Sequence, residues 1–436
     1  MWPRIGKFSR SLGYRKVEAR KQPIFSEDSR PQTSEGTLKS EKLPSFSYVT
    51  QNLSPDMAIL HVCAEGKEKY TAYGFKQGKS PIYVPPTKKP DISPGASIER
   101  GQQELTDIGI TDRIKGDMAD FSRNNQKIGK WLNSMYEKHR NNSQIVVADH
   151  TQYDIPWELL DMAPGSNGDR YLGSSFKTVR WNFRFEKWDD EKKERVPVPF
   201  RPEADVCQGK VVAYLEDREL KQEAIETELS TLGALEATVF KKSENGNMLD
   251  FENFLEKNEQ NHGLVYIACH GGFGNNTMWI GSEKDREARL YLVKLYDKVF
   301  KLVEKSQPLV FVNACHSGQL RANESIPDSL PRGFSNIFFE KGARGFLGTL
   351  GPVGNEYASK FMYNLVQRSK EHPELSLCEV LRDLRAEEVD QYRASIDAPG
   401  ENFVYSFMYV FYGNPMMKLK LNETPDISDE VKNHGR

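Results

Sequence analysis

Short apolar runs alternate with longer amphipathic segments through the second half of the chain. The apolar runs predict strands at residues 210–215, 264–268, 309–313, 345–349 and, in an aromatic run, 403–412. Apolar residues spaced three or four apart predict helices at residues 219–235, 289–305 and 356–368. Strands that are apolar on both faces and separated by helices are typical of a parallel sheet with helices on both faces. The pattern therefore predicts an α/β fold with a mostly parallel sheet.

The first half of the chain carries the same kinds of pattern over a shorter length. Two strands of a hairpin are predicted at residues 57–63 and 69–75, on either side of a turn at Gly66. We then expect a loop rich in proline and lysine at 84–94, helices within 98–140 and a strand at 144–148. This half is predicted to be a smaller α/β unit.

Changes in composition divide the chain into segments. Residues 186–208 are charged and interrupted by prolines, which predicts a linker. Residues 1–47, basic at their start, and residues 422–436 are polar and lack a hydrophobic period, which predicts disordered terminal tails. The segments that remain are a supporting α/β half at 48–185 and a larger α/β domain at 209–421.

The charge balance narrows the classes of function. The 436 residues include 60 Lys and Arg against 62 Asp and Glu, a formal net charge of −2. This balance creates no overall field for nucleic acid or for an anionic membrane. No apolar run approaches the ~18–20 residues of a membrane span, and the N-terminus lacks the apolar core of a secretory signal. We expect a cytoplasmic protein with neither a membrane nor nucleic acid as its direct partner.

The cysteines of the chain are few and scattered. The sequence holds five, at Cys63, Cys207, Cys269, Cys315 and Cys378. An odd number at irregular spacing does not fit a disulfide framework and fits a reducing compartment. The remaining question is whether one of them is reactive.

Two predicted strands end in residues that suit a nucleophile and a base. The strand at 264–268 leads into His270 and Gly271, and the strand at 309–313 leads into Cys315. Sites in open parallel sheets lie at the carboxyl ends of the strands, so neighbouring strands would place His270 and Cys315 ~5–10 Å apart. An imidazole at that position stabilises a thiolate or accepts the proton of a thiol. The backbone N–H groups of Gly271 and Cys315 are the candidates for an oxyanion hole.

Other interpretations of these residues stay open at this point. A cysteine that ends an apolar strand is commonly a small buried hydrophobe, and a histidine before two glycines can simply end a strand at a turn. The pairs Cys269–His270 and Cys315–His316 suggest zinc, but adjacent strand residues point to opposite faces and no C-x-x-C motif is present. The chain has no phosphate-binding loop and no dinucleotide fingerprint. We therefore expect no metal and no cofactor.

Further segments accompany the two strand ends in a fixed order. His270-Gly271 and Asn313-Ala314-Cys315 are preceded by the segments IVVAD and IPWELL, at 145–149 and 155–160. They are followed by a glycine-rich strand segment at 342–353 and by an aromatic segment ending in Tyr-Gly-Asn-Pro at 407–415. This ordered set, which covers roughly residues 48–420, resembles the CHAT branch of the caspase-like cysteine peptidases, relatives of caspases, separases and metacaspases.

The resemblance implies a caspase-like fold and a protease that attacks a peptide carbonyl through Cys315, with His270 as the base. It implies that residues 209–421 form the catalytic domain and that residues 48–185, which lack the dyad, form an inactive caspase-like or supporting half. It also implies an activating protein partner, because bacterial CHAT proteins are often coupled to repeat domains, sensors or gasdermin-type substrates in defence systems. The expected substrate is a protein, such as a gasdermin-like or other defence effector.

Asn313 departs from the related metacaspase segment, in which an aspartate two residues before the cysteine helps to bind a basic P1 residue. An asparagine cannot supply the negative charge that a desolvated lysine or arginine needs. Asn313 itself and the acids Asp149, Asp154 and Glu158 are the candidates for substrate binding. Each of the three acids also fits a surface carboxylate or a helix cap.

A second hypothesis assigns the chain to another class of function. A caspase-like module without catalysis could bind and regulate a partner protein. It predicts that Cys315 is no more reactive than Cys207. The intact dyad and its flanking glycines favour the peptidase, because a drifting pseudoenzyme is expected to lose one of these residues.

Overall fold

The computed structural model describes most of the region between residues 53 and 421, and all described residues belong to one compact unit within Ser45–Arg436. The described residues are 53–90, 107–164, 170–181, 186–189, 194–197, 205–244, 247–274, 277–321, 333–394 and 400–421. The predicted tails at 1–47 and 422–436 lie outside them.

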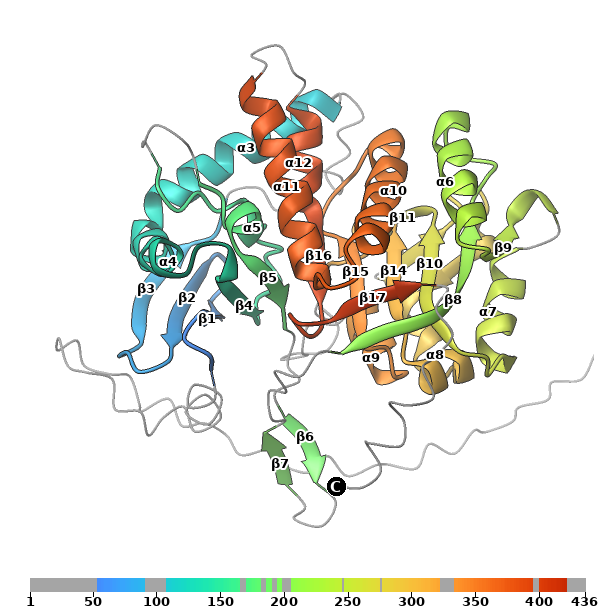
Figure 1. Ribbon diagram of the computed structural model, residues 1–436, viewed down its shortest axis with the longest axis horizontal. Coiled ribbons are helices and arrows are strands. Elements are labelled where there is room, and N and C mark those ends of the chain that lie inside the picture. The colour runs from blue at the N-terminus through green and yellow to red at the C-terminus, as the bar shows by residue number, and fades with distance from the viewer. Residues whose placement is uncertain are drawn as a thin grey trace, which may run out of the picture. The chain divides into compact units, whose positions relative to one another are not determined.

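A 12-stranded sheet forms the centre of this unit, and a three-stranded and a two-stranded sheet accompany it (Figure 1). The order in the large sheet is β17-β8-β10-β14-β15-β16-β5-β4-β1-β2-β3, and β9 also pairs with β8. Its strands are β1 (Met57–Glu65), β2 (Lys69–Lys76), β3 (Ile82–Lys88), β4 (Gln144–Asp149), β5 (Lys177–Arg180), β8 (Val206–Leu215), β9 (Thr238–Lys241), β10 (His262–Ala268), β14 (Leu309–Asn313), β15 (Gly345–Thr349), β16 (Tyr409–Tyr412) and β17 (Lys418–Leu421).

Most neighbouring strands of the large sheet are parallel. The antiparallel pairs are β1 with β2, β2 with β3, and β15 with β16. Every residue of β10, β14 and β15 is buried, as expected for strands that helices cover on both faces. The predicted α/β fold with a mostly parallel sheet is confirmed.

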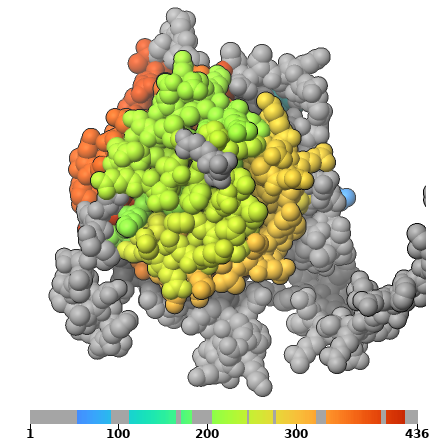
Figure 2. All heavy atoms as spheres, turned by 90° about the vertical axis from the view of Figure 1, so that its right-hand side faces the viewer, coloured from blue at the N-terminus to red at the C-terminus, as the bar shows by residue number. Residues whose placement is uncertain are grey.

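Helices cover both faces of this sheet. They are α3 (Asp107–Asn124), α4 (Gln126–His139), α5 (Leu172–Ser175), α6 (Gln222–Ala234), α7 (Met248–Lys257), α8 (Lys301–Ser306), α9 (Phe334–Glu340), α10 (Asn355–Glu371), α11 (Leu377–Ala394) and α12 (Glu401–Met408). In Figure 1, α6, α10 and α11 stand on one side of the sheet, and α8 and α9 lie on the other. Figure 2 shows the side formed by α6, α7 and the segments that follow them, in lime to orange. Among the described helices, none is long and apolar enough to cross a membrane.

The predicted helix at 289–305 is wrong over most of its length. The segment begins with the short strand β13 (Arg289–Tyr291), continues as a 3-10 helix (Leu292–Leu295) and reaches a helix only at α8. β13 pairs with β12 (Thr277–Gly281), which in turn pairs with β11 (His270–Gly274) in the three-stranded sheet. The Arg289 guanidinium also lies over the Trp279 ring, 3.7 Å from its centroid. Cross-strand contacts therefore override the helical spacing of the apolar residues.

Two further sequence predictions are wrong in part. The aromatic run at 403–412 is helical up to Met408, because Phe403 and Phe407, four residues apart, both pack against the Tyr171 ring. The loop expected at 84–94 begins inside β3, which tolerates its prolines because it is an edge strand paired only with β2. Residues 91–94 of that predicted loop lie outside the described residues.

The two parts of the chain meet within one continuous sheet. β16 pairs with β5 at a single register position, Tyr412 with Arg180. The fully buried Arg385 of α11 spans the junction, since its guanidinium donates to the carbonyls of Gly173 and Tyr409. The Trp181 indole N–H also donates to the Gly413 carbonyl at 2.6 Å. The functional division at 48–185 and 209–421 stays a prediction, within a sheet that both parts build.

The predicted linker at 186–208 is described only in pieces. It contains the two-stranded hairpin of β6 (Glu186–Asp189) and β7 (Glu194–Pro197). β8 begins at Val206, where its first residues pair with β17 near the end of the chain. The rest of the segment lies outside the described residues.

Candidate active site

The register of two neighbouring strands places His270 and Cys315 at the same edge of the sheet. β10 and β14 are parallel, and Ala268 pairs with Asn313 at the last position of their ladder. His270 and Cys315 each follow two residues after that pair. Both residues line one pocket of about 430 Å³, a volume that includes solvent at its mouth. The two strands are thus neighbours, which is the condition under which the sequence places His270 and Cys315 close together.

The pocket lies between the ends of the strands and the helices α6 and α10. Its lining residues come from α6 and the turn before it, from the ends of β10, β14 and β15, and from α10 and the loop before it: Leu220, Ala224, Glu228, Ala268, Cys269, His270, Asn313, Ala314, Cys315, Thr349, Val353, Asn355 and Ala358. This is the position expected for the site of an open parallel α/β sheet.

A network of short hydrogen bonds fixes the turn that carries Cys315. The Ala314 carbonyl accepts from the Ser317 backbone N–H at 3.2 Å and from the Thr349 hydroxyl at 2.8 Å. The Ser317 hydroxyl donates to the Val312 carbonyl and accepts from the Thr349 N–H. His316 adopts a left-handed φ of +63°, which a non-glycine residue does only when its surroundings hold it there. The thiol of Cys315 is therefore presented on a rigid turn.

Gly271 makes the close backbone approach that joins β11 to this turn. A Cβ atom at Gly271 would lie 2.2 Å from the Cys315 carbonyl oxygen, well inside van der Waals contact. Only glycine fits at that position without displacing the turn. The backbones of Gly271 and Cys315, the two proposed oxyanion-hole residues, thus lie against each other.

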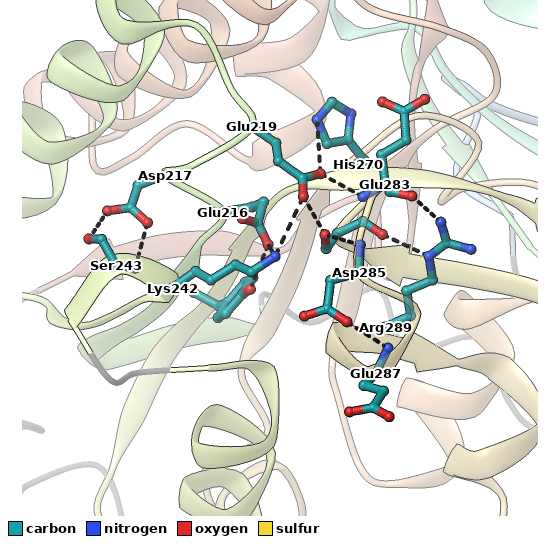
Figure 3. A network of polar contacts seen from close by, with 12 residues as sticks. Glu216, Asp217, Glu219, Lys242, Ser243, His270, Glu283, Asp285, Glu287 and Arg289 are labelled. Carbon is teal, nitrogen blue, oxygen red and sulfur yellow. Dashed lines mark hydrogen bonds and ion pairs between the residues drawn. The ribbon is translucent and has the colours of Figure 1, made fainter.

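The His270 imidazole faces a buried carboxylate that the sequence did not point to. Nε2 of His270 makes no hydrogen bond, and the nearest Glu219 carboxylate oxygen lies 3.9 Å from it (Figure 3). Glu219 lies in the turn between β8 and α6, and its side chain is only 6% exposed. The carboxylate thus faces the imidazole but lies beyond hydrogen-bonding distance.

Glu219 is held by donors from two separate segments. Its carboxylate accepts from the Ser282 hydroxyl, from the Glu283 backbone N–H at 2.6 Å, and lies 3.5 Å from the Lys242 ammonium (Figure 3). Burial opposes ionisation, but the hydrogen bonds from Ser282 and Glu283 and the charge of Lys242 outweigh it and hold the pKa of Glu219 below its ordinary value. The group facing His270 is therefore a carboxylate at neutral pH.

His316, next to the cysteine, is buried and neutral. Its pKa is lowered to about 4, first by burial and then by the Arg321 charge. Its ring contacts the Phe273 ring, with centroids 5.8 Å apart. An imidazole in this state packs as an apolar group and does not carry charge near neutral pH.

Asn313 is engaged in a buried chain of hydrogen bonds. Its amide NH₂ donates to the Tyr266 hydroxyl at 2.8 Å, and its amide oxygen accepts from the Tyr409 hydroxyl at 2.8 Å. The Tyr266 hydroxyl donates onward to Glu228 at 2.6 Å. Asn313 does line the pocket, and Glu228, a residue that the sequence did not point to, lies beside it.

The three acids proposed for substrate binding lie away from this pocket and are engaged with other groups. Asp149 accepts from the Trp157 indole N–H at 2.8 Å. Asp154 pairs with Arg321, and Glu158 forms a two-point pair with the buried Arg180. Asp149 and Asp154 line a second, smaller pocket of about 280 Å³, and none of the three lines the pocket of Cys315. Their role in substrate binding stays a prediction.

A second cysteine–histidine contact lies on β1. The Cys63 sulfur is 3.4 Å from Nε2 of His61. Burial, followed by the charges of Asp149 and Glu65, raises the pKa of Cys63 to about 11, and burial lowers that of His61 to about 3. This pair is therefore a neutral thiol beside a neutral imidazole, which is a poor nucleophile.

Burial also raises the thiol pKa of the three cysteines that remain. The values are about 12 for Cys207 and for Cys378, and the pKa of Cys269 is raised further. All three are buried, whereas Cys315 is partly exposed at the pocket. Among the five cysteines, Cys315 combines access to solvent with a histidine in the same pocket.

A family match that spans most of this architecture identifies the family of the chain. The CHAT domain family matches residues 104–403, which is more than half of the chain and includes both His270 and Cys315. The chain belongs to the CHAT domain family. This confirms the resemblance seen in the sequence.

Two other proteins are similar to this CHAT protein, one in sequence and one in fold. A probable protease of Vitiosangium sp. (strain GDMCC 1.1324) is 30% identical over 118 residues, which are 25% of this chain and 15% of that protein. The crystal structure of the Saccharomyces cerevisiae separase–securin complex has a TM-score of 0.52 and 9% identity, covering 86% of this chain and 31% of that chain. The chain thus spans less than a third of either relative. The separase similarity supports the caspase-like fold.

The CHAT match also contains Glu219 and Glu228, the two acids near the dyad that sequence reasoning missed. Glu228 has a detectable signal, because it follows Ala224 by four residues and so falls on the apolar face predicted for this helix. An acid on an apolar face indicates a buried polar function or a buried partner. Glu219 lies in a polar turn and has no comparable signal.

Proposed function

We propose that this CHAT protein is a cysteine endopeptidase in which Cys315 is the nucleophile and His270 the general base. One observation carries the proposal. The parallel register of β10 and β14 brings the two residues to one edge of the sheet, and both line the same pocket. A thiol and an imidazole that share a pocket at this edge fit the roles of a nucleophile and its base.

The chemistry proceeds in two stages. The Cys315 sulfur attacks the carbonyl carbon of the scissile peptide bond, and its proton passes to His270. The tetrahedral intermediate collapses as His270 protonates the leaving amine, which leaves an acyl-thioester on Cys315. A water molecule, deprotonated by His270, attacks the thioester carbonyl and releases the carboxylate product and the free thiol.

Two neighbouring features support this sequence of steps. The backbones of Gly271 and Cys315 lie in close contact, which supports their N–H groups as the candidates for an oxyanion hole. Glu219 faces the side of His270 that carries Nε2, where it stabilises the imidazolium that forms when the thiol loses its proton. Glu219 thus acts as a positioning residue for the histidine.

We further propose that the substrate is a protein and that a separate protein activates the enzyme. The support comes from the family, in which CHAT proteins are coupled to sensors and to gasdermin-like or other defence effectors. The separase in the similar structure is bound to securin, a protein partner. A preparation of the isolated chain that is fully active on a general peptide library would contradict activation by a partner.

The proposed peptidase is tested by comparing cleavage products of matched variants. Wild type, Cys315→Ala, His270→Ala and Cys269→Ala are incubated with the products of neighbouring genes and with a proteome extract. New N-termini are then labelled and identified by mass spectrometry. Cys269→Ala is the matched control, because it removes the buried thiol of the other cysteine in the same pocket.

We expect new N-termini with wild type and Cys269→Ala and none with Cys315→Ala or His270→Ala. Equal cleavage by wild type and Cys315→Ala, or no cleavage by either under any activating condition, contradicts the proposal. A Cys315→Ala protein that keeps its full biological effect would instead support the alternative of a catalytically silent module.

A further inference from the structure

Glu228 is a buried acid in the wall of the pocket that contains Cys315. Glu228 is 2% exposed, and it lines the pocket together with His270 and Cys315. Carboxylates are rarely buried to this extent unless a cation or several hydrogen bonds compensate for the lost water. The groups around Glu228 therefore indicate which kind of ligand the pocket binds.

The helix face that carries Glu228 also provides the room beside it. Leu220, Ala224 and Glu228 are spaced four residues apart, so they form one row along α6 and the turn before it, and all three line the pocket. Ala358 of α10 lines the pocket as well, and α6 and α10 pack against each other. Two alanines between the packed helices leave space for a side chain that enters beside the cysteine.

The hydrogen-bond chain from the sheet satisfies only one oxygen of the carboxylate. The Tyr409 hydroxyl donates to Asn313, whose NH₂ donates to the Tyr266 hydroxyl, which donates to Oε1 of Glu228 at 2.6 Å. The Asn313 NH₂ also donates to the Ala358 carbonyl at 3.1 Å. Oε2 of Glu228 has no hydrogen-bond partner and is buried.

Glu228 has no basic side chain as a partner among the described residues. None of the described lysines or arginines forms an ion pair with Glu228, whereas other deeply buried acids such as Glu158 and Glu216 do pair with a basic side chain. Burial raises the pKa of Glu228 to about 8, and the hydrogen bonds of Tyr266 and Asn313 only partly oppose it. A bound cation would favour the ionised carboxylate over the neutral acid.

We infer that Glu228 binds the side chain of the substrate residue before the scissile bond, the P1 residue, and selects lysine or arginine there. The inference rests on the proposed nucleophilic role of Cys315, since P1 is defined by the bond that Cys315 attacks. The aliphatic stem of such a side chain would contact Leu220, Ala224 and Ala358, and its charged end would donate to Oε2. An aspartate or glutamate at P1 would be repelled, and an uncharged aliphatic residue would leave Oε2 without a partner.

In this assignment, the negative charge that Asn313 cannot supply comes from Glu228 on helix α6. Asn313 retains a role, because it orients Tyr266 and through it the carboxylate of Glu228. The acids proposed from sequence, Asp154 and Glu158, already pair with Arg321 and Arg180. Glu228 is the acid of the Cys315 pocket that has an oxygen left for a ligand.

The first experiment measures covalent labelling of Cys315 by peptide acyloxymethyl ketones that differ only at P1. The probes carry lysine, arginine, norleucine or aspartate, and the variants are wild type, Glu228→Gln and Glu356→Gln. Glu228→Gln keeps an oxygen to accept from Tyr266. Glu356→Gln is the matched control, because Glu356 follows the pocket residue Asn355 but is exposed and pairs with Lys221.

We expect wild type and Glu356→Gln to react at least about tenfold faster with the lysine or arginine probe than with norleucine. In Glu228→Gln this preference is lost, because the amide carries no charge to attract the cation. Equal rates for lysine and norleucine in wild type, or an undiminished preference in Glu228→Gln, overturn the inference. Loss of the preference in Asp154→Asn instead would also overturn it.

A second experiment separates this inference from the proposed catalysis. Binding of n-butylguanidinium and of its uncharged isostere n-butylurea to the Cys315→Ala protein is followed by NMR, with and without Glu228→Gln. We expect only the guanidinium to bind, and only while Glu228 is present. This result would support the cation site even if Cys315 proved unreactive, whereas equal binding of both compounds would overturn it even if Cys315 proved catalytic.

Discussion

The Glu219 carboxylate lies 3.9 Å from Nε2 of His270, on a histidine that also lines the pocket of Cys315. The adjacent residues Ser282 and Glu283 and the more distant Lys242 hold the carboxylate in place. The base of the proposed dyad is therefore oriented by a charged group that the tertiary structure assembles. This relationship makes Glu219 the first residue to test outside the dyad.

Replacing Glu219 by glutamine should lower the reactivity of Cys315 without removing it. In the proposed mechanism the neutral amide no longer stabilises the imidazolium that forms when the thiol passes its proton to His270, so this proton transfer becomes less favourable. We expect alkylation of Cys315 by iodoacetamide to slow about tenfold, which corresponds to about 1.4 kcal/mol. The rate is measured by mass spectrometry of the Cys315 peptide between pH 6 and 9.

Glu223→Gln is the control for this measurement. Glu223 is exposed at the start of the neighbouring helix α6, so its replacement removes the same charge without touching His270. In Glu223→Gln, Cys315 should be alkylated at the same rate as in wild type. An unchanged rate in Glu219→Gln would show that Glu219 has only a structural role.

His316 should make the stability of the protein depend on pH. Its folded-state pKa of about 4 lies below the ordinary 6.5, so between these values the unfolded chain binds a proton that the folded chain excludes. Stability is therefore fully present above pH 6.5 and falls, by up to about 3 kcal/mol, as the pH drops towards 4. Urea unfolding at pH 7.5 and pH 4.5 measures this loss.

His316→Asn isolates the contribution of the histidine, because asparagine accepts the left-handed backbone conformation at this position. Other titrating groups contribute equally to both proteins. The loss of stability between the two pH values should be smaller in His316→Asn than in wild type. The same loss in both proteins would argue against a buried neutral His316.

Gly271→Ala should damage both the fold around the site and its chemistry. The added Cβ would lie 2.2 Å from the Cys315 carbonyl oxygen, so the turn must move. Overpacking of this kind costs about 1–3 kcal/mol, and a displacement of about 1 Å at a reacting group can lower the rate ~100-fold. Thermal unfolding and the cleavage assay measure the two effects.

Gly116→Ala provides the contrast. Gly116 lies within α3 and an added Cβ there would contact nothing within 4 Å, so alanine should stabilise the helix by up to about 1 kcal/mol. Cleavage should be unaffected. If Gly271→Ala behaved like Gly116→Ala, the close contact between β11 and the cysteine turn would be refuted.

Arg180→Met should destabilise the protein strongly. Arg180 donates to both oxygens of Glu158 and to the Ile155 carbonyl, and both charged side chains are at most 5% exposed. Removing the arginine leaves a buried carboxylate without its partner, which costs about 3–5 kcal/mol. Urea unfolding checks this value, with Lys301→Met as the control, since the Lys301–Glu259 pair is exposed and should change stability by less than about 0.5 kcal/mol.

The sheet was predictable from sequence where strands are buried on both faces. The observed bounds of β14 and β15 equal the predicted ranges, because an uninterrupted apolar run bounded by polar residues has few alternatives. The helix predicted at 289–305 was wrong because the apolar spacing of these residues suits a helix. Their observed structure depends instead on the pairing of β13 with the preceding strand β12 and on the contact of Arg289 with Trp279.

The candidate site shows the same difference between what a local sequence pattern predicts and what tertiary contacts determine. His270 and Cys315 were predictable because each follows a recognisable strand, and the register of two strands then brings them to one edge. Glu219 and Glu228 accept hydrogen bonds from residues far along the chain, Ser282 and Tyr266, which no local pattern identifies, although the apolar face of its helix marks Glu228 as buried. Sequence reasoning therefore pointed to the two residues of the proposed dyad and missed these two acids.

The central claim is that Cys315 is activated by His270, and competitive alkylation tests it most directly. Wild type and His270→Ala are treated with limiting iodoacetamide at pH 7, and the modification of all five cysteines is quantified by mass spectrometry. Cys63 is the internal reference, because it is also partly exposed and lies 3.4 Å from a histidine, but its pKa is raised to about 11. We predict that Cys315 reacts far faster than Cys63 in wild type and loses this advantage in His270→Ala. Equal rates for Cys315 and Cys63 in wild type, or an unchanged advantage in His270→Ala, would contradict the account.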